Sequence, residues 1–129
     1  MVKLSSDRAE KRVAHWRNVV IAACEQCGRN RIPEVEPIGD FAAVCAAASS
    51  AEQRLMLLPQ APTSLAAVAS GLRTAVLLVG PEGGLSGREQ LQAQRSGFKP
   101  CRLGPRILRT ETAPLAALAT LQALAGDLR

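Results

Sequence analysis

Hydrophobic residues recur at helical spacing near the start of the chain and then form short continuous runs. The first set has the three- and four-residue spacing of one helix face, with members Val13, Trp16, Val20, Cys24 and Cys27. This spacing predicts a helix from about 7 to 27. Two prolines, Pro33 and Pro37, exclude a helix from the polar connection that follows, where Val35 suggests a short extended segment. A second short, Ala-rich helix is predicted at about 41 to 48.

Three apolar runs, at 54–58, 74–79 and 99–103, predict strands in the rest of the chain. Thr63 or Ser64 can cap a weak helix between the first two runs, and Ser86 with Glu89 forms a capping box for a helix that reaches about Arg95. Thr112 is expected to cap a last helix, whose apolar stripe is formed by Leu115, Leu118, Leu121 and Leu124. Because strands and helices alternate, we expect an α/β fold with a mostly parallel sheet and helices on both faces.

Composition narrows the class of protein. The length of 129 residues and a hydrophobic fraction of 47% suit a single domain with one core. Aromatic residues make up only 2%, which argues against RNA binding on stacked aromatic platforms. The net charge of +5 fits a polyanionic partner, and it is equally consistent with an ordinary basic protein. Without a secretory signal or a run of about 18 apolar residues, we expect a cytoplasmic protein with reduced thiols and no membrane partner.

Three loops leave the predicted strands in the direction where open α/β sheets bind ligands. They are Leu58-Pro59, the glycine-rich segment from Gly80 to Gly84, and the segment from Leu103 to Glu111. Glycine lets backbone approach a ligand closely, although a Gly-Gly pair after a strand is also an ordinary turn. The glycine-rich segment matches neither the phosphate-binding P-loop nor the dinucleotide-binding pattern, which makes ATP and NAD poor candidates.

The other polar side chains admit two interpretations each. Arg106, Arg109 and Glu111 sit in a loop that enters a helix, either as a site or as surface charges. The pair Cys24 and Cys27 has metal-ligand spacing, but a structural zinc site needs about four ligands and no second pair exists, so core packing is favoured and no metal is expected. His15 is the only histidine, and an exposed position on the first helix is favoured over a role as general base.

Three segments together resemble the RsmE family of methyltransferases. They are AACEQCGRNRIP at 22–33, LVGPEGGLS at 78–86 and LGPRILRTETA at 103–113. The resemblance implies a SPOUT-type fold with a C-terminal trefoil knot, usually in a homodimer. It implies transfer of a methyl group from S-adenosylmethionine to N3 of a uridine in 16S ribosomal RNA of the small subunit. It also implies one SPOUT domain over 1–129, lacking the family's N-terminal RNA-binding domain and first β-α unit.

The matching motifs also imply site residues. The cofactor would be held by Leu58, Pro59, Gly80, Pro81, Glu82, Gly83, Gly84, Leu103, Gly104, Arg106, Ile107, Leu108 and Thr110. Methylation requires loss of the N3 proton of uracil or stabilisation of its anion, which arginine donors supply.

Arg109 is the first candidate for that role, with Arg29 and Asn30 second, and the carboxylates Glu82 and Glu111 are candidate bases. Two alternatives remain open: a truncated module that dimerises and binds cofactor without methylating, and a general basic RNA-binding protein.

Overall fold

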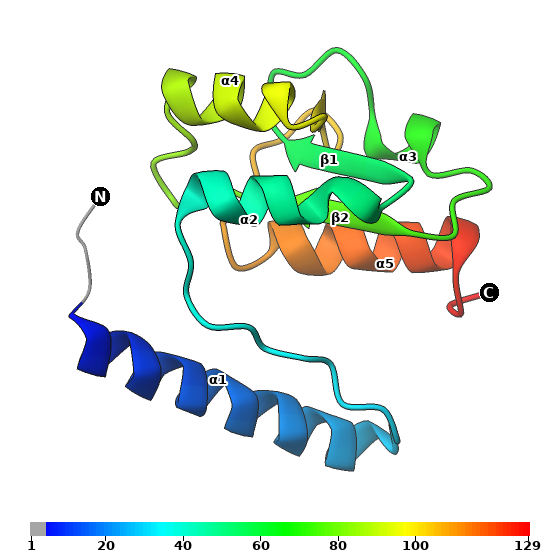
Figure 1. Ribbon diagram of the computed structural model, residues 1–129. Coiled ribbons are helices and arrows are strands. Elements are labelled where there is room, and N and C mark those ends of the chain that lie inside the picture. Colours follow the sequence, from blue (N-terminus) through cyan, green and yellow to red (C-terminus); the bar gives the residue numbers. More distant parts are fainter. Residues whose placement is uncertain (1–4) are drawn as a thin grey trace. The chain divides into compact units, whose positions relative to one another are not determined.

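The computed structural model describes residues 5–129 and divides the chain into two compact units, 1–40 and 41–129 (Figure 1). In the first unit, helix α1 (Ser6–Cys27) ends at Gly28, whose φ of 76° is left-handed and whose N–H bonds the Cys24 carbonyl. Val35 forms no strand; its carbonyl accepts two hydrogen bonds, of 3.2 and 3.0 Å, from the Arg17 guanidinium. The predicted helix is confirmed, and the connection that follows it contains no strand.

The apolar spacing of α1 overstated how much of the helix is buried. Val13 and Cys24 are buried, whereas the Trp16 side chain is 42% exposed and Cys27 is exposed. The expectation that both cysteines pack on the apolar side therefore holds for Cys24 alone.

The second unit is an α/β structure, as the alternation predicted. Its elements are α2 (Phe41–Ala47), the 3-10 turn η1 (Ala48–Ser50), β1 (Gln53–Leu57), α3 (Leu65–Val68), β2 (Ala75–Leu78), α4 (Gly87–Arg95), β3 (Lys99–Cys101) and α5 (Ala113–Ala125). The three strands are parallel in the order β2-β1-β3. Leu55 of β1 pairs with Leu77 of β2 on one side and Lys99 of β3 on the other.

Successive side chains of β1 point to opposite faces of the sheet, and each face is covered by helices. Met56 packs with Cys45 of α2, Ala93 of α4 and Phe98. Leu55 packs on the other face in a second cluster, with Leu65 of α3, Cys101 of β3 and Ala117 of α5. Full burial of a leucine or methionine side chain contributes about 1.5–3 kcal/mol. The predicted parallel sheet with helices on both faces is confirmed.

Caps fix where two of the helices begin. In α4, the Glu89 N–H donates to the Ser86 hydroxyl at 3.2 Å while the Ser86 N–H donates to the Glu89 carboxylate at 2.8 Å. Ser64 similarly accepts from the Ala67 N–H at 3.3 Å at the start of α3. The predicted capping residues are confirmed, and α4 therefore starts directly after the glycine-rich loop.

Of the predicted apolar stripe of α5, Leu121 alone packs against the core. Leu115, Leu118 and Leu124 are 69%, 51% and 45% exposed, and the core contacts come from Ala117 and Leu121. A spacing of three residues drifts by about 60° at each step around a helix that turns about 100° per residue, whereas spacing by four keeps Ala117 and Leu121 on one face. Thr112 was expected to cap this helix, but its side chain makes no capping hydrogen bond, so that expectation is wrong.

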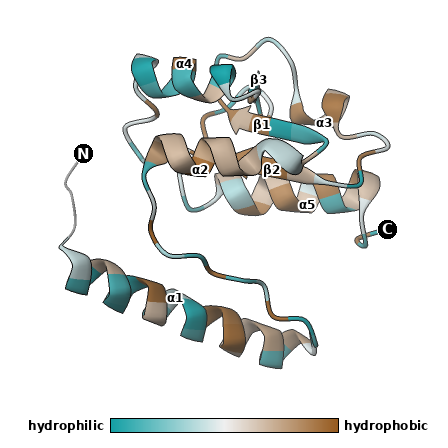
Figure 2. Cartoon of the chain, viewed as in Figure 1, coloured by the Kyte–Doolittle hydropathy of each residue, from teal (hydrophilic) through white to brown (hydrophobic). Residues whose placement is uncertain are grey.

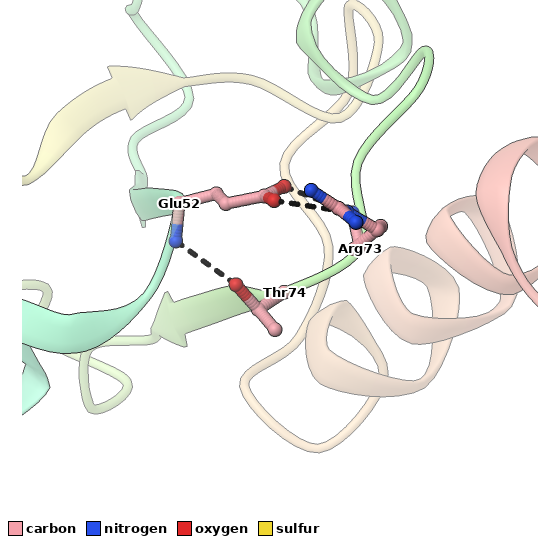
Figure 3. Close-up of polar contacts among 3 residues, drawn as sticks. All are labelled: Glu52, Arg73 and Thr74. Carbon is pink, nitrogen blue, oxygen red and sulfur yellow. Dashed lines mark hydrogen bonds and ion pairs between the residues drawn. The ribbon is translucent and has the colours of Figure 1, made fainter.

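Polar contacts join the amino ends of β1 and β2, as Figure 3 shows. The Glu52 carboxylate accepts from the Arg73 backbone N–H at 3.0 Å and from its Nε at 3.3 Å, and the Glu52 N–H donates to the Thr74 hydroxyl at 3.0 Å. The Arg73 backbone N–H is the main reason that the pKa of Glu52 lies below its ordinary value. These bonds fix the register of the two strands at their amino ends, opposite the loops that follow their carboxyl ends.

Candidate functional site

A pocket of about 140 Å³ lies beyond the carboxyl ends of the parallel strands. Its walls come from the segment that follows β1, the glycine-rich loop after β2, and the loop between β3 and α5. The lining residues are Leu57, Leu58, Pro59, Val79, Gly80, Pro81, Glu82, Gly84, Leu85, Leu103, Arg106, Ile107, Leu108, Thr110 and Ala113. The three loops that the sequence placed at one edge of the sheet therefore meet in a single hollow, where open α/β sheets bind their ligands.

The glycine-rich loop folds back on itself to form one wall. The Gly84 N–H bonds the Pro81 carbonyl at 2.8 Å, and Gly84 has a φ of 77°, which favours glycine. A Cβ on Gly80 would lie 3.0 Å from the Leu85 backbone nitrogen and 3.1 Å from its Cγ. Leu85 occupies the space that a side chain at position 80 would need. The absence of a Cβ therefore lets Gly80 and Leu85 pack directly against each other.

The opposite wall is anchored by Arg102, directly after β3. Its N–H donates to the Thr63 carbonyl at 2.9 Å and its carbonyl accepts from the Leu65 N–H at 2.9 Å. Its guanidinium donates to the Ala61 carbonyl at 3.0 Å and also to the Pro62 carbonyl. Arg102 therefore ties the end of β3 to the start of α3 through both its backbone and its side chain. These bonds fix the point from which the following loop departs.

That loop turns into α5 through the Arg109 carbonyl, which accepts from the Thr112 and Ala113 N–H groups at 3.0 and 2.9 Å. Gly104, with a φ of 69°, makes the turn at the other end of the loop. The loop therefore has both ends fixed by backbone geometry, while Arg106 and Ile107 between them line the pocket with exposed side chains.

The chemistry of the lining suits a nucleoside that carries a charged sulfur. Leucine, valine and isoleucine are the commonest side chains of the lining and can enclose a flat heterocycle. The glycines of the lining let backbone approach a ligand closely. Glu82 supplies the acidic group of the lining, which also includes Arg106 and Thr110. S-adenosylmethionine therefore fits the donor set.

The structure brings most of the predicted cofactor residues together. Those that line the pocket are Leu58, Pro59, Gly80, Pro81, Glu82, Gly84, Leu103, Arg106, Ile107, Leu108 and Thr110. Gly83 and Gly104 belong to the same loops but do not line it.

The residues predicted to act on the substrate lie elsewhere. Arg109 and Glu111 are exposed and are not among the lining residues. Arg29 and Asn30 belong to the first unit, where both are exposed and the Arg29 Nε donates to the Arg31 carbonyl at 3.0 Å.

Four lining residues were not predicted from the sequence: Leu57, Val79, Leu85 and Ala113. Each directly flanks a residue or loop that was predicted. Extending each loop by one or two positions into the neighbouring element would have found them, because the last side chains of a strand or the first of a helix form the floor of such a pocket.

Other sequence features have plain structural outcomes. Among residues 5–129, no three potential metal-ligating side chains gather at one point. In that same part of the chain, no helix has the length and apolar character needed to cross a bilayer. All four cysteines are free thiols, three of them buried, and burial raises the pKa of Cys101 to about 11. His15 is exposed on α1, as expected.

Comparisons with known proteins converge on one family. A family model described as an RNA methyltransferase domain matches residues 1–122. A protein from Buchnera aphidicola named ribosomal RNA small subunit methyltransferase E is 41% identical over 92% of this chain and 48% of its own length. The protein of that name from Bacillus subtilis is 31% identical over 98% of this chain and 54% of its own length. This chain thus spans about half the length of these relatives.

Solved structures agree with the sequence matches. A ribosomal RNA small subunit methyltransferase E from Neisseria gonorrhoeae, bound to S-adenosylmethionine, superposes with a TM-score of 0.88 at 41% identity, covering 100% of this chain and 54% of its own. A Legionella pneumophila protein in complex with the same cofactor gives a TM-score of 0.85 at 39% identity, over 95% of this chain and 50% of its own.

Proposed function

This chain belongs to the RNA methyltransferase domain family, and its resemblance to RsmE is confirmed; from that premise we propose that it binds S-adenosylmethionine and methylates N3 of a uridine in 16S ribosomal RNA. The observation that carries the proposal is the meeting of three separate loops in one apolar pocket at the carboxyl ends of the strands. Structural neighbours that match over nearly this whole chain were solved with the same cofactor.

We propose that the cofactor is held by the residues predicted from the motifs, which are concentrated in the glycine-rich loop and the loop before α5. Leu58, Leu103 and Leu108 would enclose the adenine ring, because they supply apolar surface from three different segments. Glu82 would face the positive end of the ligand, where a carboxylate is attracted to the sulfonium. Gly104 would act through the shape of its loop, which its φ of 69° sets, and Gly83 would contribute its backbone alone.

When bound, the cofactor supplies an electrophilic methyl group, so the protein's own task is to position the uracil and manage its N3 proton. The loop that holds the pocket-lining Leu108 and Thr110 also carries the exposed Arg109 between them. This position suits a donor that meets the uracil oxygens from the rim and stabilises the charge that develops when N3 loses its proton. Glu111 is the proposed acceptor of that proton, and Arg29 and Asn30 are secondary candidates for substrate contacts.

Two arginines of one loop provide a matched test of these roles. Arg106 lines the pocket and Arg109 does not. We expect R106A to weaken cofactor binding, and R109A to leave that binding unchanged while lowering turnover by about 100-fold or more, a loss typical of one missing electrostatic stabiliser. Calorimetry with S-adenosylmethionine and a single-turnover methylation assay measure the two effects separately. Loss of cofactor binding in R109A would show that Arg109 is a pocket residue instead.

The activity itself is tested by incubating the chain with small ribosomal subunits and radiolabelled S-adenosylmethionine, followed by nucleoside analysis for N3-methyluridine. Label in that nucleoside supports the proposal. Cofactor binding without label would favour a module that binds the cofactor but does not methylate. Absence of both would leave general RNA binding, which the net charge of +5 alone allows.

We further propose that two copies of the chain associate through α5. This helix is apolar around most of its circumference, as its brown and tan colouring in Figure 2 shows, and a helix of that kind is normally covered on several sides. Leu115 and Leu118 are nevertheless 69% and 51% exposed. L118E should shift the chain from dimer to monomer in sedimentation, whereas V44E, at the 54% exposed Val44 of α2, should not. Equal behaviour of the two variants would refute this interface.

The domain assignment and the knot are also part of the proposal. We propose that residues 1–129 form one SPOUT domain, because the family model spans residues 1–122 and so extends across both units. We propose a trefoil knot in the C-terminal part, where the glycine-rich loop and the loop before α5 line the same pocket. A substrate in 16S ribosomal RNA and four free thiols suit the cytoplasm as the site of action.

A further inference from the structure

One face of α4 is positively charged and lies outside the pocket already described. Its members recur at helical spacing and line an open hollow of their own: Arg88, Leu91, Gln92 and Arg95. Both arginines are exposed, Leu91 is 54% exposed, and Gln92 is half-buried. Figure 2 shows the same helix coloured as hydrophilic at both of its ends.

The charge of this face is not neutralised by the protein. Within residues 5–129, neither Arg88 nor Arg95 takes part in a hydrogen bond or ion pair of its side chain. The one acidic residue of α4, Glu89, turns its carboxylate back to the Ser86 N–H at 2.8 Å as part of the capping box. No acidic residue stands three or four positions from either arginine, where helix neighbours meet.

We propose that this α4 face binds the phosphate backbone of RNA. Arg95 follows Arg88 by seven positions, which places the two about 10 Å apart along the helix axis. This distance lets each arginine contact a different phosphate of one strand. Arginine is suited to bidentate contacts with phosphate oxygens, and the amide of Gln92 and the apolar surface of Leu91 lie between the two charges.

The α4 face lies close in sequence to the cofactor pocket, so it can position RNA for the proposed reaction. Leu85 lines the cofactor pocket, and Arg88 follows it by only three residues, at the start of α4. RNA that runs along α4 would therefore lead towards the rim of the pocket. The inference rests on the proposed function for the identity of the polyanion, and it adds a substrate-positioning surface that the cofactor pocket does not include.

The test is anisotropy of a fluorescein-labelled single-stranded RNA of mixed sequence, titrated with the full chain at several salt concentrations. The double variant R88Q/R95Q should bind roughly tenfold more weakly, and its log-log salt dependence should be shallower by about 1.4, or about 0.7 for each lost phosphate contact. The charge-preserving R88K/R95K should stay within about twofold of the unmodified chain. As a matched control, R8Q/R12Q removes the same charge from exposed positions of α1 and should change neither quantity.

Equal weakening in both glutamine variants would overturn the proposal, because it would show an effect of overall charge. A greater loss for polyglutamate than for RNA would also overturn it and would indicate an acidic protein partner. Calorimetry with S-adenosylmethionine on R88Q/R95Q separates binding of the cofactor from binding of RNA by the α4 face. The variant should retain the affinity of the unmodified chain for the cofactor. Failure of the unmodified chain to bind cofactor would count against the proposed function and not against this surface.

Discussion

The contact between Gly80 and Leu85 leads to a prediction about the shape of the pocket. In the variant G80A, the new methyl carbon would lie 3.0 Å from the Leu85 backbone nitrogen and 3.1 Å from its Cγ. Ordinary carbon contacts are about 3.5–4.0 Å, so the wall must open by several tenths of an ångström. The backbone nitrogen cannot swing away as a side chain would, which leaves movement of the loop as the only relief.

Overpacking of this kind costs about 1–3 kcal/mol. The free protein can relax the wall, but the cofactor requires the wall in its original place, so we expect the cost to fall on binding. Even about 1 kcal/mol weakens binding of S-adenosylmethionine by about fivefold, and the upper end of the range by about 150-fold. Calorimetry measures this affinity directly, and thermal unfolding reports any additional loss of stability, at about 4 °C per kcal/mol for a chain of this size.

The same loop provides the control. Gly83 has no atom within 4 Å of the position of an added Cβ, and its φ is not positive. G83A should therefore bind the cofactor as the unmodified chain does and be neutral or slightly more stable, since alanine restricts the unfolded state. If G80A bound the cofactor as tightly as G83A, the wall formed by Gly80 and Leu85 would not belong to the binding site, and the reasoning would be refuted.

Three further predictions concern stability and reactivity. Because the folded pKa of Glu52 is lowered, its stabilising effect should be present above the unfolded pKa of about 4.3 and lost as the pH falls through the folded value. The urea midpoint of E52Q should therefore lie below that of the unmodified chain at pH 7, and the difference should shrink as the pH falls below about 4.3. A thiol reagent should modify only Cys27 in the native protein and all four cysteines after unfolding, since burial keeps Cys101 neutral with a pKa of about 11. L55A should lose about 2–5 kcal/mol of unfolding free energy, against about 0.5 kcal/mol or less for L91A, because Leu55 is fully buried and Leu91 is 54% exposed. Equal losses in the two leucine variants would contradict the assigned core.

Sequence patterns predicted the elements of this fold well because each pattern is set locally. The run at 54–58 became β1, and the Ser86–Glu89 capping box fixed the start of α4. The direction of the three loops followed from the rule that parallel strands present their carboxyl ends at one edge. That rule was enough to place Gly80 and Leu103 in the same pocket.

The failures came from features that depend on tertiary packing. In α5, most of the regularly spaced leucines are exposed, and the core contacts come from the small Ala117 and from Leu121. In the loop before α5, the matching motif separated Arg106, which lines the pocket, from Arg109, which does not, but no spacing rule would have done so. The direction of each side chain there depends on the turn at Gly104 and on the backbone bonds to the Arg109 carbonyl.

Chemical shift mapping of the isotope-labelled chain titrated with S-adenosylmethionine reports whether one ligand contacts all three loops. We expect the largest amide shifts in three separate segments, 57–59, 79–85 and 103–113, and we expect them to saturate together. Shifts confined to one of these segments, or centred elsewhere in the chain, would contradict a single pocket built from all three.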